Sequence, residues 1–218
     1  MPRPLRIQFP GAWYHVFNRG ARRQAVFADD RDRSAFVQRL SELEARFDAE
    51  IHAYCLMGNH YHLVIHTPAG NLDQVMHWLL FAYTKRFNAR HGFDGPLYRD
   101  RYKSILIDSD SYLAAVSRYV HRNPLEAGLV EKLVDYRWSS YRDYLGCRNP
   151  RPWVHKQATM AIVGGDVARY QGFVEVGAAD HQLTEFYGSS RIPPVLGNED
   201  FAVASTKRAA EWSTSRTA

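Results

Sequence analysis

The sequence predicts an α+β fold: an antiparallel sheet with helices on one face, followed by a C-terminal extension. Short runs rich in aromatic and β-branched residues, typical of strands, alternate with longer segments of helical periodicity. Two of the strand-like runs are separated only by Gly58-Asn59, which favours a hairpin turn and antiparallel pairing. With 45% hydrophobic and 13% aromatic residues among 218, the chain can bury a substantial core.

The first part of the chain supplies a strand, a helix and a hairpin in that order. The strand is "AWYHVFN" (12–18), which Arg19-Gly20 ends. The segment from Asp29 to Glu50 begins with capping residues and predicts one amphipathic helix, because its apolar side chains recur at helical spacing: Phe36, Val37, Leu40, Leu43 and Phe47. The hairpin then joins the runs 51–57 and 60–65.

The next segments complete the predicted sheet. A helix is expected over 72–91, and the loop "GFDGP" (92–96) ends it. The alternating run "YKSILID" (102–108) predicts a strand. A third helix follows, capped by Asp108 or Ser109, and we expect Pro124 to end it at about Asn123. The order strand, helix, strand, strand, helix, strand is that of a ferredoxin-like sheet, whose helices we expect on one face.

We assign residues 1–146 to this domain, with "WSSYRDYLG" (138–146) as a short closing helix, and residues 147–218 to a C-terminal extension. Periodicity is weak from about Pro150, so the extension is expected to be only partly helical. Pro193-Pro194 and the Ala-, Ser-, Thr- and Arg-rich residues beyond them predict a mobile end covering the last two dozen residues.

Several function classes are disfavoured by composition. The chain has no run of eighteen apolar residues and its first residues lack an apolar signal segment, so we expect a cytoplasmic protein that does not insert into membranes. The two cysteines, Cys55 and Cys147, have neither the spacing of a metal knuckle nor the number for a disulfide framework. We interpret them as reduced packing residues.

The net charge of +5 and the pI near 9.2 make nucleic-acid phosphates plausible partners. Arginines gather near aromatic residues in "NRGARRQ" (18–24) and "LYRDRYK" (97–103). A solvated basic surface without a nucleic-acid partner is equally consistent with the charge alone.

His60 and His62 lie two residues apart in a predicted strand, so their side chains project from the same face. Two neighbouring imidazoles form half of a metal site, and a third ligand must come from elsewhere in the chain. The alternative is that both histidines are polar residues of a half-exposed strand.

Tyr119 and Asn123 lie four apart in the third predicted helix, and therefore on one face. A tyrosine beside a divalent ion can act as a covalent nucleophile on a phosphodiester that the ion polarises. The alternative is a core tyrosine, one of thirteen in the chain.

Five segments in this order resemble the one-tyrosine HUH transposases, specifically the branch of REP-associated tyrosine transposases. They are "YHVFNRGARRQ" (14–24), "GNHYHLVI" (58–65), "GPLYRDRYKSILID" (95–108), "YVHRNPLEAGLV" (119–130) and "WSSYRDYLG" (138–146). The resemblance covers roughly residues 6 to 146.

The resemblance implies a role for each matching residue. His60 and His62 look like the metal-binding pair, with Tyr61 between them, and Tyr119 looks like the nucleophile. Asn123 stands where the family places a third polar ligand, although it precedes a proline and can instead cap the helix end. Our candidates for phosphate contacts and for stacking on unpaired bases are Arg19, Arg22, Arg23, Arg99, Arg101 and Lys103, with Tyr98 and Tyr102.

The implied reaction is metal-assisted transesterification of single-stranded or hairpin DNA through a 5′-phosphotyrosine, without ATP. Mg²⁺ or Mn²⁺ is the expected ion, although two imidazoles can also hold zinc. The resemblance allows a monomer or a homodimer. Two other interpretations stay open: a non-catalytic hairpin DNA-binding protein or regulator on the same scaffold, and an unrelated metal hydrolase that uses His60 and His62 while Tyr119 is structural.

Overall fold

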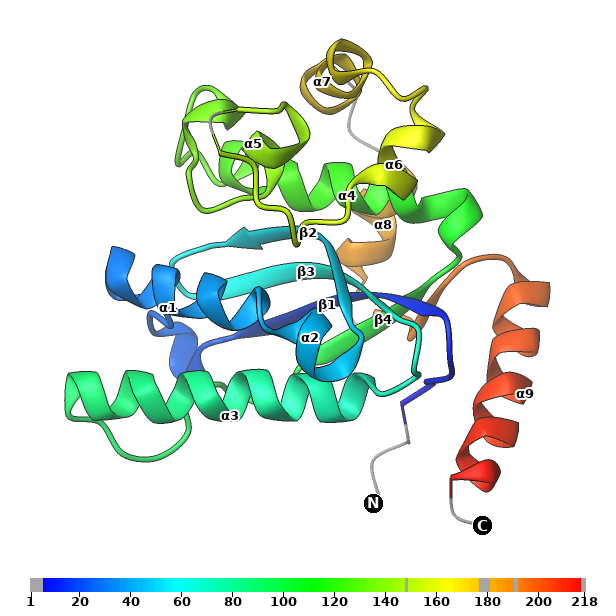
Figure 1. Ribbon diagram of the computed structural model, residues 1–218, viewed down its shortest axis with the longest axis horizontal. Helices are drawn as coiled ribbons and strands as arrows, with labels where there is room; N and C mark the ends of the chain where they lie inside the picture. Colours follow the sequence, from blue (N-terminus) through cyan, green and yellow to red (C-terminus); the bar gives the residue numbers. More distant parts are fainter. Residues whose placement is uncertain (1–5, 148, 177–180, 190–191, 217–218) are drawn as a thin grey trace.

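A five-stranded sheet forms the centre of the computed structural model, which describes residues 6–147, 149–176, 181–189 and 192–216 (Figure 1). Its strands lie in the order β2-β3-β1-β4-β5, and the first four pair antiparallel, as predicted. The bounds are β1 (Ala12–Arg19), β2 (Glu50–Leu56), β3 (His60–Thr67), β4 (Lys103–Ile107) and β5 (Val195–Leu196). The α+β class and the ferredoxin-like order of the first four strands are therefore confirmed.

The hairpin of β2 and β3 turns at Gly58-Asn59, as predicted. Leu56 pairs with Tyr61, and the Met57 amide donates to the His60 carbonyl at 2.9 Å. Alternation along β3 then sends Tyr61 into one core layer and His62 toward the other.

The two helical connections of the ferredoxin-like unit cover one face of the sheet, as expected (Figure 1). Phe36, Val75 and Tyr83 pack there against the strand residues Val16 and Leu63. This layer contains α1 (Asp30–Leu40), α2 (Leu43–Phe47) and α3 (Leu72–His91), and the bounds of α3 are those predicted.

The prediction of one continuous helix from Asp29 to Glu50 is wrong. Asp29 does cap α1, since its carboxylate accepts from the Arg31 and Asp32 amides. The helix ends at Leu40, where the Ser41 hydroxyl bonds the Gln38 carbonyl. The short α2 then ends because Asp48 adopts a left-handed conformation, with φ of 53°, so that Glu50 already belongs to β2.

The opposite face of the sheet is covered by α4 (Ser109–Glu126), whose Val116 and Val120 pack in a second core layer with Val64 (Figure 1). The helices of the whole molecule therefore lie on both faces. Pro124 does not end α4 near Asn123, as the sequence suggested. It lies inside the last turn, where its missing amide removes a single hydrogen bond, and the Ala127 amide still donates to the Asn123 carbonyl at 3.0 Å.

The C-terminal extension packs back onto the sheet. It contains α6 (Gln157–Ile162), α7 (Val167–Glu175), α8 (His181–Gly188), β5 and α9 (Glu199–Ser215), and α5 (Tyr141–Tyr144) lies just before it, where a short helix was expected. Short 3₁₀ turns occur at Ala21–Arg23 and Leu133–Asp135.

The last two dozen residues, expected to be mobile, form β5 and α9 in the part that the structure describes. β5 pairs parallel with β4, and the Trp212 indole donates to the Gly70 carbonyl at 3.2 Å. Composition favoured mobility, but the open edge of β4 and the packing of Trp212 supply partners that a local pattern does not reveal. The division into residues 1–146 and 147–218 stays a prediction.

Both cysteines are unpaired, and Cys55 is fully buried, in agreement with a packing role. None of the helices in the described ranges has the length and apolar character needed to cross a bilayer.

Candidate active site

His60 and His62 open β3 and lie side by side on the face that α4 covers, as their spacing predicts. Their ring centroids are 5.1 Å apart, with the rings nearly perpendicular. Both line a hollow of about 590 Å³. The hairpin turn therefore delivers two imidazoles to one cavity.

A hydrogen bond at Nδ1 holds each ring. His60 Nδ1 lies 2.7 Å from Asn59 Oδ1, and His62 Nδ1 lies 2.9 Å from His15 Nε2. The other nitrogen of His15 is 2.6 Å from the Tyr187 hydroxyl. Among the described residues no hydrogen bond engages Nε2 of either His60 or His62. Each ring therefore has the orienting partner of a metal-binding histidine and one nitrogen left for a ligand.

The environment keeps both imidazoles neutral. Burial, helped by the nearby Arg19, lowers the pKa of His60 to about 4. Burial also lowers the pKa of His62 well below its ordinary value, with smaller contributions from His15 and His60. A neutral imidazole is the form that binds a metal ion.

Tyr119 reaches the same hollow from α4. Its ring meets that of His62 edge to face, with centroids 5.8 Å apart, and stacks on Tyr187 of α8 at 4.4 Å. Burial raises the pKa of the Tyr119 hydroxyl and the charge of Glu126 adds to this, while the side chain of Asn123 opposes it. The phenol is therefore protonated at neutral pH in the protein alone.

Asn123 also lines the hollow, one helical turn after Tyr119. Its Nδ2 donates to the Tyr119 carbonyl at 2.9 Å, so part of the amide is engaged with the helix backbone. Its role as a metal ligand stays a prediction. His121 does not line the hollow and bonds the Tyr170 hydroxyl and the Ser140 hydroxyl instead, each at 2.7 Å.

All six basic residues expected at the DNA are exposed and gather around the hollow. Four line it directly: Arg19, Arg99, Arg101 and Lys103. Arg22 and Arg23 line an adjoining hollow of about 520 Å³, which shares Arg19 and Arg99 with the first. The two hollows therefore form one basic surface beside the histidines and Tyr119.

The family model described as "Transposase IS200 like" matches residues 8–123, more than half of the chain. The chain belongs to the IS200-like transposase family. The matched segment contains His60, His62, Tyr119 and Asn123. None of the curated proteins matches the chain.

Solved structures that match this transposase include the two described here. A REP-associated tyrosine transposase bound to a REP hairpin aligns with a TM-score of 0.55 and 18% identity, covering 71% of this chain and 91% of the other. At that identity the likeness concerns the fold, and it agrees with the family resemblance found in the sequence. A protein from Deinococcus radiodurans R1 described as a transposase aligns with a TM-score of 0.38 and 17% identity, covering 56% and 95% of the two chains.

The two tyrosines expected to stack on unpaired bases are packed into or against the core of this transposase. Tyr102 is only 7% exposed, and the guanidinium of Arg6 lies 3.7 Å from its ring centroid, so it is not available to a base. Tyr98 lines the adjoining hollow with part of its ring, but its hydroxyl is buried. Tyr102 comes just before β4 and belongs to the same core layer as Leu106, a placement that became clear only once the strands were paired.

Two residues near the site were not found from the sequence. His15 lies on β1 opposite Val64 of β3, and Tyr187 belongs to α8. The alternation in "AWYHVFN" shows that His15 and Phe17 share a face, but only the pairing of β1 with β3 shows that this is the face of His62. No sequence signal marked Tyr187, because the extension carries none of the motifs.

Proposed function

We propose that this transposase cleaves and rejoins single-stranded DNA through a 5′-phosphotyrosine at Tyr119, in a divalent-metal-dependent reaction at hairpin-forming repetitive palindromic sequences. The observation that carries the proposal is a single hollow lined by His60, His62, Tyr119, Asn123 and four basic side chains. That set combines a nucleophile, metal-binding nitrogens and groups that bind a phosphate backbone.

His60 and His62 fit a divalent cation, because each is oriented through Nδ1 and keeps Nε2 open. Asn123 is the candidate third ligand, and Mg²⁺ or Mn²⁺ suits a site whose other donors are oxygens. When bound, the cation supplies positive charge that polarises the phosphate and favours ionisation of the nearby phenol.

In the proposed step the Tyr119 hydroxyl oxygen forms a bond to a backbone phosphorus, and the bond from that phosphorus to the 3′ oxygen breaks. The phenol proton passes to solvent and the departing 3′ oxygen takes up a proton, so that a 3′-hydroxyl and a 5′-phosphotyrosine result. Attack by a 3′-hydroxyl reverses the exchange and rejoins a strand. The phosphotyrosine bond keeps the energy of the diester, and no high-energy cofactor is needed.

The basic surface supports a DNA substrate that extends past the hollow. Arg22 and Arg23 lie beyond the four cations at the site, in the left-handed region of backbone space with φ of 52° and 63°. Non-glycine residues there are strained, and such strain gathers at functional positions. We propose hairpin DNA as the substrate because a protein of similar fold, the REP-associated tyrosine transposase, is bound to a REP hairpin in its structure.

The test is a labelled single-stranded hairpin oligonucleotide, carrying a palindromic repeat, incubated with Mn²⁺ and resolved on a denaturing gel. Wild type should give a slower-migrating band, which is the covalent protein–DNA adduct. Addition of a chelator should prevent its formation. Tyr119→Phe should give none, a loss of at least 10³-fold, because it lacks the nucleophilic oxygen. Tyr112→Phe is the matched control, since Tyr112 lies on the same helix outside the hollow.

Other outcomes separate the remaining interpretations. Hairpin binding without an adduct in wild type would support a non-catalytic DNA-binding regulator. Metal-dependent cleavage that survives in Tyr119→Phe would mean that water is the nucleophile.

A further inference from the structure

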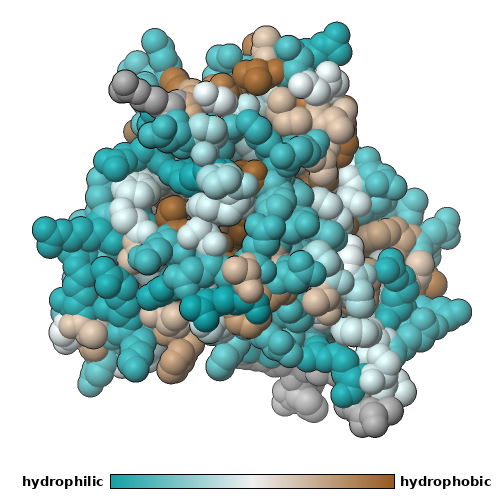
Figure 2. All heavy atoms as spheres, viewed as in Figure 1, coloured by the Kyte–Doolittle hydropathy of each residue, from teal (hydrophilic) through white to brown (hydrophobic). Residues whose placement is uncertain are grey.

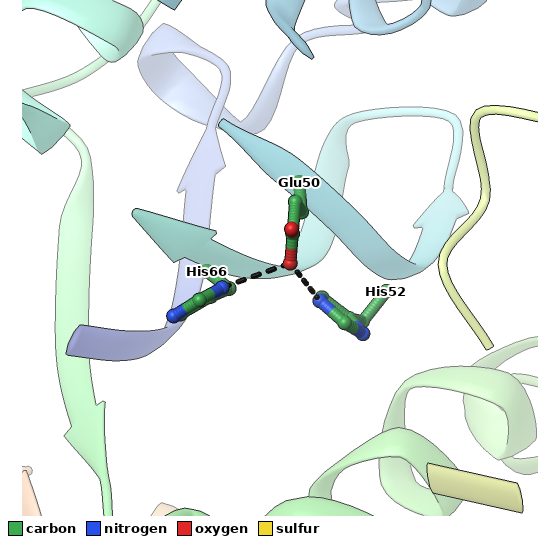
Figure 3. Close-up of side chains that lie close together, drawn as sticks. All are labelled: Glu50, His52 and His66. Carbon is green, nitrogen blue, oxygen red and sulfur yellow. Dashed lines mark hydrogen bonds and ion pairs between the residues drawn. The ribbon is translucent and has the colours of Figure 1, made fainter. Parts of the chain in front are cut away.

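We propose that Glu50, His52 and His66 form a second metal site, one that binds a divalent transition-metal ion such as Zn²⁺ (Figure 3). The three residues offer one carboxylate and two imidazoles, a donor set that suits Zn²⁺. The inference does not depend on the proposed function.

The ligand atoms are already close together. Glu50 Oε2 lies 3.1 Å from His52 Nε2 and 2.8 Å from His66 Nδ1, and all three atoms lie within 4.8 Å of one another. Ligands at the usual zinc distances of about 2.0 to 2.2 Å in a tetrahedral arrangement are separated by roughly 3.3 Å. Small side-chain rotations therefore suffice to place an ion between them.

The backbone brings this cluster together through an irregularity in the sheet. Glu50 and His66 are direct cross-strand partners, so their side chains share a face. The register of β2 and β3 shifts between Ile51 and Ala53, which makes His52 the extra residue of a bulge. Bulges often re-aim a side chain, and here His52 joins the cross-strand pair, as Figure 3 shows.

Aromatic packing holds the two imidazoles in place. Trp13 of β1 stacks on His66 with ring centroids 4.5 Å apart, and it contacts the tilted ring of His52 at 4.2 Å. The His52 side chain is only 4% exposed, whereas those of His66 and Glu50 are 19% and 29% exposed. The cluster is thus preorganised on one side and open to an entering ion on the other.

This site is separate from the hollow of Tyr119. His62 and His66 are four residues apart on β3, which corresponds to roughly 13 Å along an extended strand. No residue of the cluster lines the hollow that contains His60 and His62. A single ion cannot be shared between the two groups of histidines.

The experiment uses the full chain with His60→Ala and His62→Ala as background, so that only the second site remains. Zinc binding is measured by calorimetric titration with ZnCl₂, for the background alone and for the background carrying Glu50→Gln or His66→Asn. Glu44→Gln is the matched control, because Glu44 is another acidic residue of the same region that bonds a histidine, His155 at 3.1 Å. Circular dichroism shows whether each variant is folded.

We expect one Zn²⁺ per chain in the background and in the Glu44→Gln control, and at least tenfold weaker binding with Glu50→Gln or His66→Asn. Binding that these two folded variants leave unchanged would overturn the proposal, and so would a background that binds no zinc. If neither variant folds, Co²⁺ replaces zinc in the background protein. One bound cobalt per chain with visible absorption typical of mixed nitrogen and oxygen ligands supports the site, and its absence refutes it.

Discussion

His62 is held by two side chains that the sequence did not connect with it. Its Nδ1 meets His15, and His15 in turn meets the Tyr187 hydroxyl, so three residues from β3, β1 and α8 form one chain of hydrogen bonds. Tyr187 also stacks on Tyr119. The extension therefore contacts the proposed nucleophile directly and reaches the proposed metal ligand His62 through His15.

Replacing His15 with leucine should weaken metal binding at the Tyr119 hollow about 10- to 100-fold, because the orienting partner of His62 is lost. Bound Mn²⁺ is counted by electron paramagnetic resonance in a Glu50→Gln background, which removes the second proposed site. Val64→Ala, a change at the strand position that pairs with His15, is the control and should leave Mn²⁺ affinity unchanged. Equal affinity in His15→Leu and wild type would contradict this role.

His121 connects α4 to the segments that follow it, and it does so as a fully buried neutral imidazole. Burial lowers its pKa from 6.5 to about 3. Between about pH 3 and pH 6.5 the unfolded chain therefore binds a proton at His121, whereas the folded chain does not. This contribution to stability is complete above pH 6.5 and decreases as the pH falls toward 3.

For this one group the free energy of unfolding should fall by about 1.4 kcal/mol per pH unit within that window. His121→Gln keeps hydrogen-bonding capacity but does not titrate, so its stability should decrease less steeply below pH 6.5 than that of wild type. Urea unfolding at pH 7, 6, 5 and 4 measures both slopes. If the free energy of unfolding falls equally with pH in the two proteins, His121 does not contribute to the pH dependence of stability.

At the level of elements, α9 is attached to the ferredoxin-like unit at the end opposite to the start of β3. Trp212 donates to the Gly70 carbonyl, and Arg208 lies over the ring of Phe9 at 4.2 Å. Gly70 itself packs against the backbone of Phe9 and Pro10, since its φ is +63° and an added Cβ would lie 2.6 Å from the Phe9 backbone. The helix covers the region where β1 begins and β3 ends.

Trp212→Ala should lower the free energy of unfolding by about 1 to 2 kcal/mol, because it removes partly buried apolar surface and one hydrogen bond. It should leave adduct formation unchanged, since α9 contributes no residue to the hollow of Tyr119. Urea unfolding beside the exposed neighbour variant Glu211→Ala measures the effect. Loss of adduct in a stable Trp212→Ala protein would show that α9 acts on the site.

For the molecule as a whole, the positions of the positive charges say more about phosphate binding than the net charge of +5 does. The face shown in Figure 2 is largely hydrophilic, with apolar residues in small separate groups, so it offers no broad apolar surface. The cations at the Tyr119 hollow and the adjoining hollow form a single basic surface. Phosphate binding should therefore be concentrated there.

Arg99→Ala combined with Arg101→Ala should reduce the salt dependence of single-stranded DNA binding. Each lost phosphate contact lowers the magnitude of the slope of log K against log salt by about 0.7, so the pair should lower it by about 1.4. Lys85→Ala combined with Arg86→Ala removes the same charge from the exposed surface of α3 and should not change the slope. Equal slopes in the two double variants would show that Arg99 and Arg101 do not contact DNA phosphates.

Local sequence determined much of this architecture, because turn chemistry and hydrophobic periodicity act over a few residues. The Gly58-Asn59 turn set the hairpin, alternation put His60 and His62 on one face, and the apolar stripe of 72–91 marked α3. The family resemblance directed attention to Tyr119, which helical periodicity alone does not distinguish from other tyrosines.

Tertiary structure decided what depends on contacts between distant segments. The pairing of β1 with β3 brought His15 to His62, and the docking of α8 brought Tyr187 to Tyr119. The same long-range packing buried Tyr102 and ordered α9, although local composition indicated exposure and mobility. A side chain's neighbours across a sheet are set by strand order and register, and neither is encoded within a single element.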